Sequence, residues 1–430
     1  MRRRTFLALA GGTAAATLSG CAASESGALR FEGWDFEPQL VEQNLARFMQ
    51  RNPQIRVEYT PITSAQFIQK ITAEFMGGSG PDAMYMYDDY LASAVEAEWL
   101  QPIDGLPGVD RIYEAIYPVN AQAMSYAGRR WGVPYYTDST CLTYNRRMLD
   151  QAGIKAPPRS LEELEAQCLT IRDRTGMRSP VGISAQLQDT AWSWWWSLVY
   201  ANEADIFTPE LAPAVAAPSS PLPGILEWLQ QASRNQVVDP AAVQTGAIPL
   251  DNAMMAGQYA FMFGARYSLR KYNDPKKSKE AGNLAAALIP GLNPDTRGTA
   301  GSTRMYVIKA DTELRDQAMT LLNYLGGFGD EDYPYTAKFW FDQQGLGYPF
   351  RELAGDPQIQ ADLAKWIDPV VYAELADVAR PRSITAVPWY AEFEAALQRR
   401  TQEVLIGQLS PADACRQLDE TAQTLVQRYA

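Results

Sequence analysis

Residues 29–59 read LRFEGWDFEPQLVEQNLARFMQRNPQIRVEY and combine three patterns in one continuous stretch. Residues 29–34 form a short strand-like run. Apolar side chains then recur at helical spacing over residues 38–51, until Asn52-Pro53 breaks the helix. Residues 55–59 alternate between apolar and polar side chains, as a strand does. The stretch therefore predicts a strand–helix–strand unit, and such units build parallel sheets with right-handed crossovers.

Acidic residues follow two of the strands predicted in this part of the chain. A helix over residues 64–76 ends at Gly77-Gly78, and residues 83–87 form a third apolar strand. Trp34-Asp35 follows the first strand and Asp88-Asp89 follows the third. Open parallel sheets bind ligands beyond the carboxyl ends of their strands. The sequence therefore indicates a binding site at this edge of the sheet.

The rest of the chain continues to alternate helices with strands. Residues 160–163 (Ser-Leu-Glu-Glu) are a capping box that opens a helix, and Ser410-Pro411 opens another. Strands return at 285–289 and 305–308, and residues 270–279 are a charged segment that we expect to be a solvated loop. This alternation over such a length predicts an α/β fold of two lobes.

The composition excludes several classes of protein. The chain has 430 residues, of which 47% are apolar, so it is globular and has room for two or three domains. A formal net charge of -12 disfavours nucleic acid, because phosphate binding needs clustered cations. The absence of histidine excludes Ser-His-Asp triads and His-ligated metals. None of the four cysteines (Cys21, Cys141, Cys168 and Cys415) forms a CxxC pair, so we expect neither a metal nor a cofactor.

Residues 1–20 have the character of an export signal. Arg2 to Arg4 precede an apolar stretch that is too short to span a bilayer. Residues 3–7 (Arg-Arg-Thr-Phe-Leu) resemble a twin-arginine signal, and a general secretory signal is the alternative. Leu18-Ser19-Gly20-Cys21 resembles the lipobox of bacterial lipoproteins, although an ordinary cleaved signal with an incidental Cys is the other interpretation. The lipobox implies that Cys21 is diacylated and that residues 21–28 tether a soluble body to a membrane, outside the cytoplasm.

Four motifs occur in order along the body. They are Asn52-Pro53 with Gly80-Pro81-Asp82-Ala83-Met84 and residues 97–103 (AEWLQPI); residues 128–149 (GRRWGVPYYTD, then LTYN and ML); Gly257 to Gly264; and Gly301-Ser302 with the strand Met305 to Ile308. Their order and spacing resemble the extracellular solute-binding proteins of ABC importers, in the carbohydrate-binding group of the maltose-binding protein type. The resemblance covers nearly the whole chain after Cys21.

The resemblance implies an α/β fold of the two-lobed periplasmic-binding-protein type, with a ligand cleft between the lobes. Carried over, one lobe would hold residues 29–136 and 298–329, and the other would hold 137–297 and 330–430. It also implies a sugar ligand, hinge closure around it, and docking of the closed form on a membrane permease with its ATPase. Catalysis is not implied, and we expect a monomer.

The chemistry of sugars indicates which residue types such a cleft needs. The C–H faces of a sugar ring stack on flat aromatic rings, and its hydroxyls need donors and acceptors in fixed positions. A carboxylate accepts two hydroxyl protons in charge-assisted bonds. Aspartate together with tryptophan is therefore the pairing we expect for a neutral sugar, and the chain contains 11 Trp and 22 Tyr.

A first group of candidate residues follows the predicted strands and the first crossover. Trp34 could stack on a sugar ring or simply cover the edge of its lobe. Asp89 lies where the family often places a sugar-binding carboxylate, with Asp88 as the alternative register and a solvated loop acid as the structural interpretation. Tyr136 and Asp138 lie at the predicted crossover, where the family commonly has a carboxylate.

A second group lies in the cluster Trp192-Ser193-Trp194-Trp195-Trp196. Successive side chains on a helix point about 100° apart, so these tryptophans cannot all face one cleft. We expect Trp194 or Trp195 to be a sugar platform and the others to be core. Among the other aromatic side chains, Trp340, Tyr348 and Trp389 are secondary candidates that we expect to be structural.

A third group comes from the two later motifs. Arg266 stands where many relatives carry an aromatic residue, and Arg304 follows Gly301-Ser302 near another predicted crossover. Gly301 and Ser302 would offer backbone and hydroxyl contacts. Each arginine could bind sugar hydroxyls, pair with Asp138, or bind an anion in a bidentate manner. A surface or interlobe salt bridge is the structural interpretation.

Three alternatives stay open at this point. The ligand could be anionic or otherwise polar, such as a glycerol phosphodiester, a uronate or a peptide, since two arginines are candidates. A secreted carbohydrate-active enzyme is the second alternative, because paired carboxylates with tryptophan also describe glycosidases. The third is an adhesin or sensor that uses the same lobes without a transporter.

Overall fold

The computed structural model describes residues 27–187, 192–329 and 331–429. The predicted export signal, the lipobox and Cys21 lie outside these residues. Within the described ranges, no helix is long and apolar enough to cross a bilayer. The described chain forms a nine-stranded sheet with helices on its faces and a separate two-stranded hairpin, β4 (Ser125–Tyr126) with β5 (Arg129–Arg130).

The predicted strand–helix–strand unit is confirmed at the start of the fold. β1 (Ala28–Trp34) pairs in parallel with β2 (Arg56–Ile62), and α1 (Pro38–Arg51) connects them. Pro38 stands in the first turn of α1, where its missing N–H is not needed. The buried face of α1 repeats at helical spacing through Val41, Asn44, Leu45 and Phe48. β3 (Ala83–Tyr87) is parallel to β1 on its other side, so the acidic segments at 35 and 88–89 follow neighbouring strands.

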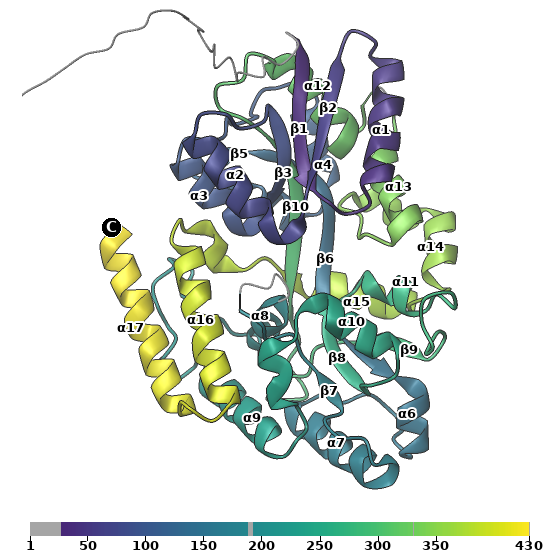
Figure 1. The fold of residues 1–430 in the computed structure, drawn as a ribbon, viewed down its shortest axis with the longest axis vertical. Helices are drawn as coiled ribbons and strands as arrows, with labels where there is room; N and C mark the ends of the chain where they lie inside the picture. Colours follow the sequence, from purple (N-terminus) through teal and green to yellow (C-terminus); the bar gives the residue numbers. More distant parts are fainter. Residues whose placement is uncertain (1–26, 188–191, 330, 430) are drawn as a thin grey trace, which may run out of the picture.

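Two long strands join the upper and lower halves of the molecule in Figure 1. β6 (Gly132–Asn145) and β10 (Thr299–Ile308) are antiparallel over residues 132–139 and 301–307. The first part of β10 also pairs with β11 (Ala379–Arg380), and its end pairs with β3. The last part of β6 pairs instead with β8 (Phe261–Ala265) and β9 (Leu284–Ala287), and β8 pairs with β7 (Val181–Gly182). One continuous sheet therefore runs through both halves.

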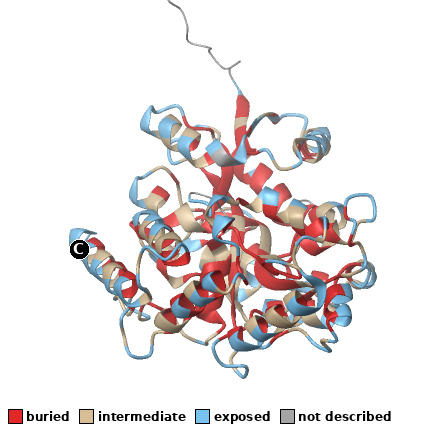
Figure 2. Cartoon of the chain, turned by 60° about the horizontal axis from the view of Figure 1, so that its bottom comes forward, coloured by how far each residue is buried: buried red, intermediate tan, exposed pale blue. Residues whose placement is uncertain are grey.

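Helices surround this sheet. Besides α1, their bounds are α2 Phe67–Met76, α3 Leu91–Glu96, α4 Val109–Ala115, α5 Pro118–Ala123, α6 Arg146–Gln151, α7 Leu161–Thr175, α8 Ser193–Tyr200, α9 Leu222–Arg234, α10 Ala247–Met255, α11 Ser268–Tyr272, α12 Arg315–Gly326, α13 Tyr335–Gln344, α14 Pro357–Leu363, α15 Pro369–Asp377, α16 Tyr390–Leu405 and α17 Pro411–Tyr429. Figure 2 shows the buried segments gathered along the central strands and the exposed ones on the outer helices.

Buried apolar side chains form two core clusters, and the helices after residue 330 divide between them. Trp340 of α13 belongs to the first cluster, and its ring lies 5.4 Å from that of Tyr135. Phe393 of α16 and Leu418 of α17 belong to the second cluster, where both helices pack on α9. The boundaries of the two lobes stay a prediction.

Helix ends follow the sequence signals, with one correction. Ser160 Oγ accepts the N–H of Glu163, as the capping box predicts, and Glu163 in turn accepts from the N–H of Arg159. The segment beginning at Arg270, expected to be a solvated loop, instead begins inside α11. Arg270 donates to two carbonyls near the C-terminus of α13, those of Phe341 at 2.7 Å and Asp342 at 2.5 Å, and pairs with Asp362 at 3.1 Å. Cations are favourable near the C-terminus of a helix.

Candidate functional site

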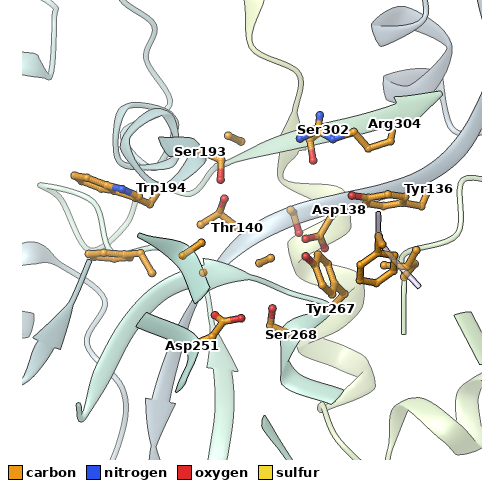
Figure 3. Close-up of a pocket in the computed structure, with 18 of the residues that line it drawn as sticks. Tyr136, Asp138, Thr140, Ser193, Trp194, Asp251, Tyr267, Ser268, Ser302 and Arg304 are labelled. Carbon is orange, nitrogen blue, oxygen red and sulfur yellow. The ribbon is translucent and has the colours of Figure 1, made fainter. Parts of the chain in front are cut away.

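A cavity of about 250 Å³ lies where β6 and β10 pass between the two halves of the molecule. We call it the cleft cavity. The residues labelled in Figure 3 line it: Tyr136, Asp138, Thr140, Ser193, Trp194, Asp251, Tyr267, Ser268, Ser302 and Arg304. Trp34, Tyr87 and Phe263 complete its aromatic wall. Because a bound water needs only about 10–15 Å³, the cavity has room for a small organic molecule.

The alternation of side chains along two paired strands builds the floor of the cleft cavity. Successive side chains of a strand point to opposite faces, so Tyr136, Asp138 and Thr140 share one face of β6. Ser302 stands opposite Asp138 in the antiparallel register, and Arg304 stands opposite Tyr136. Five side chains with polar groups, from two strands, therefore reach the cavity from one continuous surface.

Asp138 is the acidic group at the centre of this floor. Only 6% of the residue is exposed, and its Oδ1 has no hydrogen-bond partner within the described part of the chain. Burial raises the pKa of this carboxyl to about 6, although the positive charge of Arg266 opposes the shift. The nearest cation atom, Arg266 Nε, lies 3.6 Å from Oδ1. Asp138 therefore holds a carboxyl oxygen that is free to accept a hydrogen bond from a ligand hydroxyl.

Aromatic rings bound the cleft cavity from both halves of the molecule. Trp34 lies on Tyr87 with ring centroids 4.6 Å apart and planes 19° apart, so one aromatic face is already occupied by a neighbour. Trp194 donates its indole N–H to the carbonyl of Ser184 at 2.7 Å, which fixes the orientation of the ring. Tyr136 and Tyr267 meet edge to face at 6.4 Å. The ring of Trp194 also stacks on those of Trp192 at 5.6 Å and Phe263 at 6.3 Å, and the residue is 1% exposed. The cavity thus has an aromatic wall in addition to its carboxyl group.

The structure separates the two tryptophans that were equal candidates. Trp194 lines the cleft cavity. Trp195 belongs to the second core cluster, with none of its surface exposed, and packs edge to face on Trp196 at 5.3 Å. The physical reason is the turn of about 100° per helical residue, which points neighbouring side chains of α8 in different directions. Trp195 is therefore not brought to the cavity.

Both predicted arginines already have carboxylate partners. Arg304 lines the cleft cavity, and its Nη1 lies 2.5 Å from Asp88 Oδ1. Asp88 also accepts the N–H of Thr303 at 3.0 Å, and the residue is only 3% exposed. Asp89, the other carboxylate of this segment, forms an ion pair with Arg382 and lines a neighbouring cavity instead. Asp88 rather than Asp89 is thus the carboxylate that is coupled to the cleft, through Arg304.

Arg266 and Gly301 lie on a different cavity from the cleft. That cavity, of about 290 Å³, is lined by Asn120, Ser139, Arg266, Gly301, Tyr348 and Tyr372, among others, and we call it the back cavity. Arg266 places its guanidinium 3.8 Å from the ring centre of Tyr372 and donates to the backbone carbonyl of the same residue at 3.1 Å. Asp138, Ser139 and Ser302 line both cavities.

The secondary candidates have mainly structural environments. Trp340 lies in the first core cluster and Trp389 in the second, whereas Tyr348 lines the back cavity.

Asp35 accepts hydrogen bonds from both the N–H and the hydroxyl of Ser64, at 2.9 and 2.8 Å. It therefore orders the turn at the start of the 3₁₀ segment before α2.

Several lining residues were missed by the sequence reasoning. Thr140 could have been found, since it follows Asp138 by two positions on the same strand. Tyr267 directly follows Arg266, and only the end of β8 determines which of the two faces the cleft. Asp251 of α10 and Ser268 of α11 have no local signal, because tertiary packing brings their helices to the cavity. Asp251 accepts from the hydroxyl of Tyr272 and pairs with Lys271 at 3.2 Å.

The chain is similar over most of its length to a known family. Residues 35–327 match the family of bacterial extracellular solute-binding proteins. A protein of Brucella abortus (strain 2308) that is named as a binding protein is 21% identical over 372 residues, which are 85% of this chain and 84% of that protein. Because the family match covers more than half of the sequence, the chain belongs to the bacterial extracellular solute-binding proteins. Membership implies that the protein is exported.

Solved structures show the same fold. The maltose-bound MalE3 of T. maritima has a TM-score of 0.79 at 17% identity, covering 93% of this chain and 100% of that one. An ABC transporter solute-binding protein of Thermotoga lettingae, bound to α-D-tagatose, has a TM-score of 0.78 at 21% identity, covering 93% and 99%. The predicted fold class, a two-lobed α/β fold with a ligand cleft between the lobes, is thereby confirmed, as is the family resemblance.

Proposed function

We propose that the protein is the substrate-binding lipoprotein of an ABC importer and captures a neutral sugar or polyol in the cleft cavity. The observation that carries this proposal is the buried carboxyl of Asp138, with a free oxygen, in a cavity that Ser302 and the ring of Trp194 also line. A carboxylate and hydroxyls match the hydroxyl groups of a sugar, and the indole matches its C–H face. The similar structures from T. maritima and Thermotoga lettingae hold maltose and tagatose, which are both uncharged.

The charges around the cleft cavity favour a neutral ligand over an anion. Among the described residues that line the cavity, Arg304 is the one cation, and Asp88 neutralises it at 2.5 Å. Arg266, the second arginine proposed for an anion, lies on the back cavity beside Asp138. Asp138 and Asp251 add negative charge to the lining. An anionic ligand would have to displace carboxylates from both arginines, so we place sugar acids and phosphodiesters second.

The proposal includes no catalysis. Of the two carboxylates that line the cleft cavity in the described part of the chain, Asp251 is engaged by the hydroxyl of Tyr272 and the ammonium of Lys271. Glycoside hydrolysis needs one carboxylic acid and one free carboxylate flanking the scissile bond. A turnover assay on model glycosides tests this part, and sugar release that depends on the protein would contradict it.

The transport role extends the proposal to the whole molecule. The two lobes would close around the ligand by bending at β6 and β10, one lobe being residues 29–136 with 298–329 and the other 137–297 with 330–430. The closed form would then dock on the permease as a monomer. Diacylation of Cys21 would hold the protein at the membrane, since each buried CH₂ contributes about 0.8 kcal/mol. Mass spectrometry of the membrane fraction would show the acylated Cys21, and a mature chain without lipid would contradict this part.

The proposed ligand class is tested by thermal unfolding of residues 22–430 with neutral sugars, polyols, sugar acids and glycerol phosphodiesters. A ligand at 100 times its dissociation constant should add about 2.7 kcal/mol to the free energy of unfolding. We expect the melting temperature to rise with a neutral compound and to stay unchanged with the anions. A rise with anions alone would overturn the neutral ligand in favour of the phosphodiester or uronate alternative.

A further inference from the structure

The back cavity lies behind the floor of the cleft cavity. Thr137, Gly301 and Thr303 line it, and these positions alternate along β6 and β10 with the cleft residues Tyr136, Ser302 and Arg304. Because alternate side chains of a strand face opposite sides, the two strands separate the two cavities. The volume of the back cavity, about 290 Å³, is as large as that of the cleft cavity.

Buried polar atoms without hydrogen-bond partners converge on the back cavity. Among the described residues, Asn120 Oδ1, Ser139 Oγ, Asp138 Oδ1 and Arg266 Nε have none, and the exposed fractions of these four residues are 0%, 3%, 6% and 3%. The other side of the Asn120 amide donates to Thr303 Oγ1 at 2.8 Å, which fixes the direction of the free oxygen. Leaving one such atom unsatisfied costs about 1–3 kcal/mol. Asp138 and Ser139 also line the cleft cavity, whereas Asn120 and Arg266 line the back cavity and not the cleft. The unpartnered atoms of Asn120 and Arg266 therefore indicate a molecule in the back cavity that supplies the missing bonds.

The chemistry of these atoms defines the class of that molecule. Asn120 and Asp138 offer acceptors, Arg266 offers a donor, and Ser139 offers both, which is the complement of several hydroxyl groups. The charge of Arg266 is balanced by Asp138 at 3.6 Å, and exposed Asp377 at the mouth of the cavity repels anions. The rings of Tyr348 and Tyr372 add apolar wall for C–H groups.

We propose that the back cavity is a second binding site, for a small uncharged molecule rich in hydroxyl groups, such as a short polyol. The exposed alanines Ala373 and Ala376 of α15 border it, so solvent and solutes reach it from the side of α15. Because Asp138 and Ser302 line both cavities, occupancy of the back cavity changes the affinity of the cleft, and the cleft ligand changes the affinity of the back cavity by the same factor. This site rests on its own geometry, independently of which solute the cleft takes.

The alanines around the two cavities allow a direct test by methyl NMR. Ala354, Ala373, Ala376 and Ala379 line the back cavity, whereas Ala247, Ala265 and Ala300 line the cleft. The full chain, labelled at alanine methyl groups, is titrated with glycerol, erythritol, ribitol and D-mannitol. We expect at least one polyol to shift the back-cavity methyls along a binding curve with its own dissociation constant, different from that of the cleft methyls.

Two variants separate binding in the back cavity from movement of the hinge. Ala376→Trp fills the mouth of the cavity from an exposed position and should abolish the back-cavity curve while the cleft curve remains. Ala412→Trp places the same side chain at an exposed position of α17 and should change neither curve. If no polyol shifts the back-cavity methyls, or if both sets of methyls follow one curve that Ala376→Trp leaves intact, the back cavity holds only water and the proposal is overturned.

Discussion

Asp138 makes the stability of the protein depend on pH. Its pKa of about 6 in the folded chain exceeds the value of about 3.9 in an unfolded chain, so the folded state binds this proton more tightly. The stabilisation from proton uptake is complete below about pH 4 and is lost as pH rises through 6. We expect the wild type to gain roughly 1 kcal/mol in the free energy of unfolding from this group between about pH 7 and pH 5. Urea unfolding at about pH 7 and pH 5 measures this change in free energy for the wild type. The corresponding change for Asp138→Asn should be smaller by that amount.

The same residue should control ligand affinity. The ionised carboxylate accepts hydrogen bonds from ligand hydroxyls and is lost when the carboxyl binds a proton. Affinity for a neutral ligand should therefore fall as pH drops below about 6. Hydrogen bonds to charged groups contribute about 1.5–3 kcal/mol, and Asp138→Asn should therefore weaken binding by roughly 10- to 100-fold near pH 7. Calorimetric titration measures both effects, and an Asn variant that binds as tightly as the wild type would show that Asp138 does not contact the ligand.

Arg304 should be important for stability because of the carboxylate behind it. Arg304→Ala removes the closest cation of Asp88, which is 3% exposed, and leaves only the more distant Arg382, at 4.0 Å, to balance its buried charge. Breaking a buried ion pair on one side costs about 3–5 kcal/mol, and we expect the low end because Thr303 N–H still donates to Asp88. Arg399→Ala, at an exposed position of α16, is the matched control and should change the free energy of unfolding by less than about 0.5 kcal/mol. Chemical denaturation measures both values, and equal stabilities would contradict the role of the pair.

At the scale of single elements, α8 offers the clearest separation of binding from packing. Trp194→Leu and Trp195→Leu each remove a buried indole and should each destabilise the protein, by up to about 3–5 kcal/mol. Trp194→Leu should also weaken ligand binding by about tenfold or more, because a buried Trp at a binding surface is often a dominant contact. Trp195→Leu should leave affinity unchanged in the fraction that is folded. A loss of affinity in the Trp195 variant alone would reverse the orientation described for α8.

Gly347 approaches the backbone of β6 so closely that only glycine fits there. A Cβ on Gly347 would lie 2.0 Å from the carbonyl oxygen of Thr137, and the N–H of Thr137 donates to Gly347 at 2.9 Å. Gly347→Ala must therefore displace β6, and overpacking of this kind costs about 1–3 kcal/mol. Gly355→Ala meets no atom within 4 Å and is the control, with an expected change near zero. Thermal unfolding distinguishes them, and equal melting temperatures would show that the crossing adapts without strain.

Local patterns predicted the elements of the fold well, because periodicity and breakers act within a few residues. The helix over 38–51 and the strand over 83–87 have the predicted bounds. The helix predicted to open at Ser410-Pro411 is α17, and its residues Ala414, Leu418, Ala422 and Leu425 are buried. The prediction that Arg270 lies in a solvated loop was wrong, since the residues that it contacts, Phe341 and Asp362, lie far away in the sequence. A charged side chain near a distant helix end has no local signature.

At the scale of the whole molecule, the site depends on how two long strands are paired. Asp138 and Ser302 could be nominated from the family resemblance, and Trp194, with Trp195 as an equal candidate, from the tryptophan cluster. The structure brings Asp138, Ser302 and Trp194 to one cavity. The placement of Arg266 behind the floor and of Tyr267 in front of it follows from the register at the end of β8, which composition and spacing do not specify. The back cavity exists only through the docking of α15 beside β6 and β10, so no segment of the sequence could have indicated it.

The most direct test of the proposed function is a crystal structure of the protein with the neutral sugar or polyol that gives the largest thermal shift. We predict ligand density in the cleft cavity, with a hydroxyl within hydrogen-bond distance of Asp138 and a C–H face on the ring of Trp194. Density for this ligand only outside the cleft cavity, or a cleft that binds a sugar acid or phosphodiester through Arg304 instead, would contradict the account.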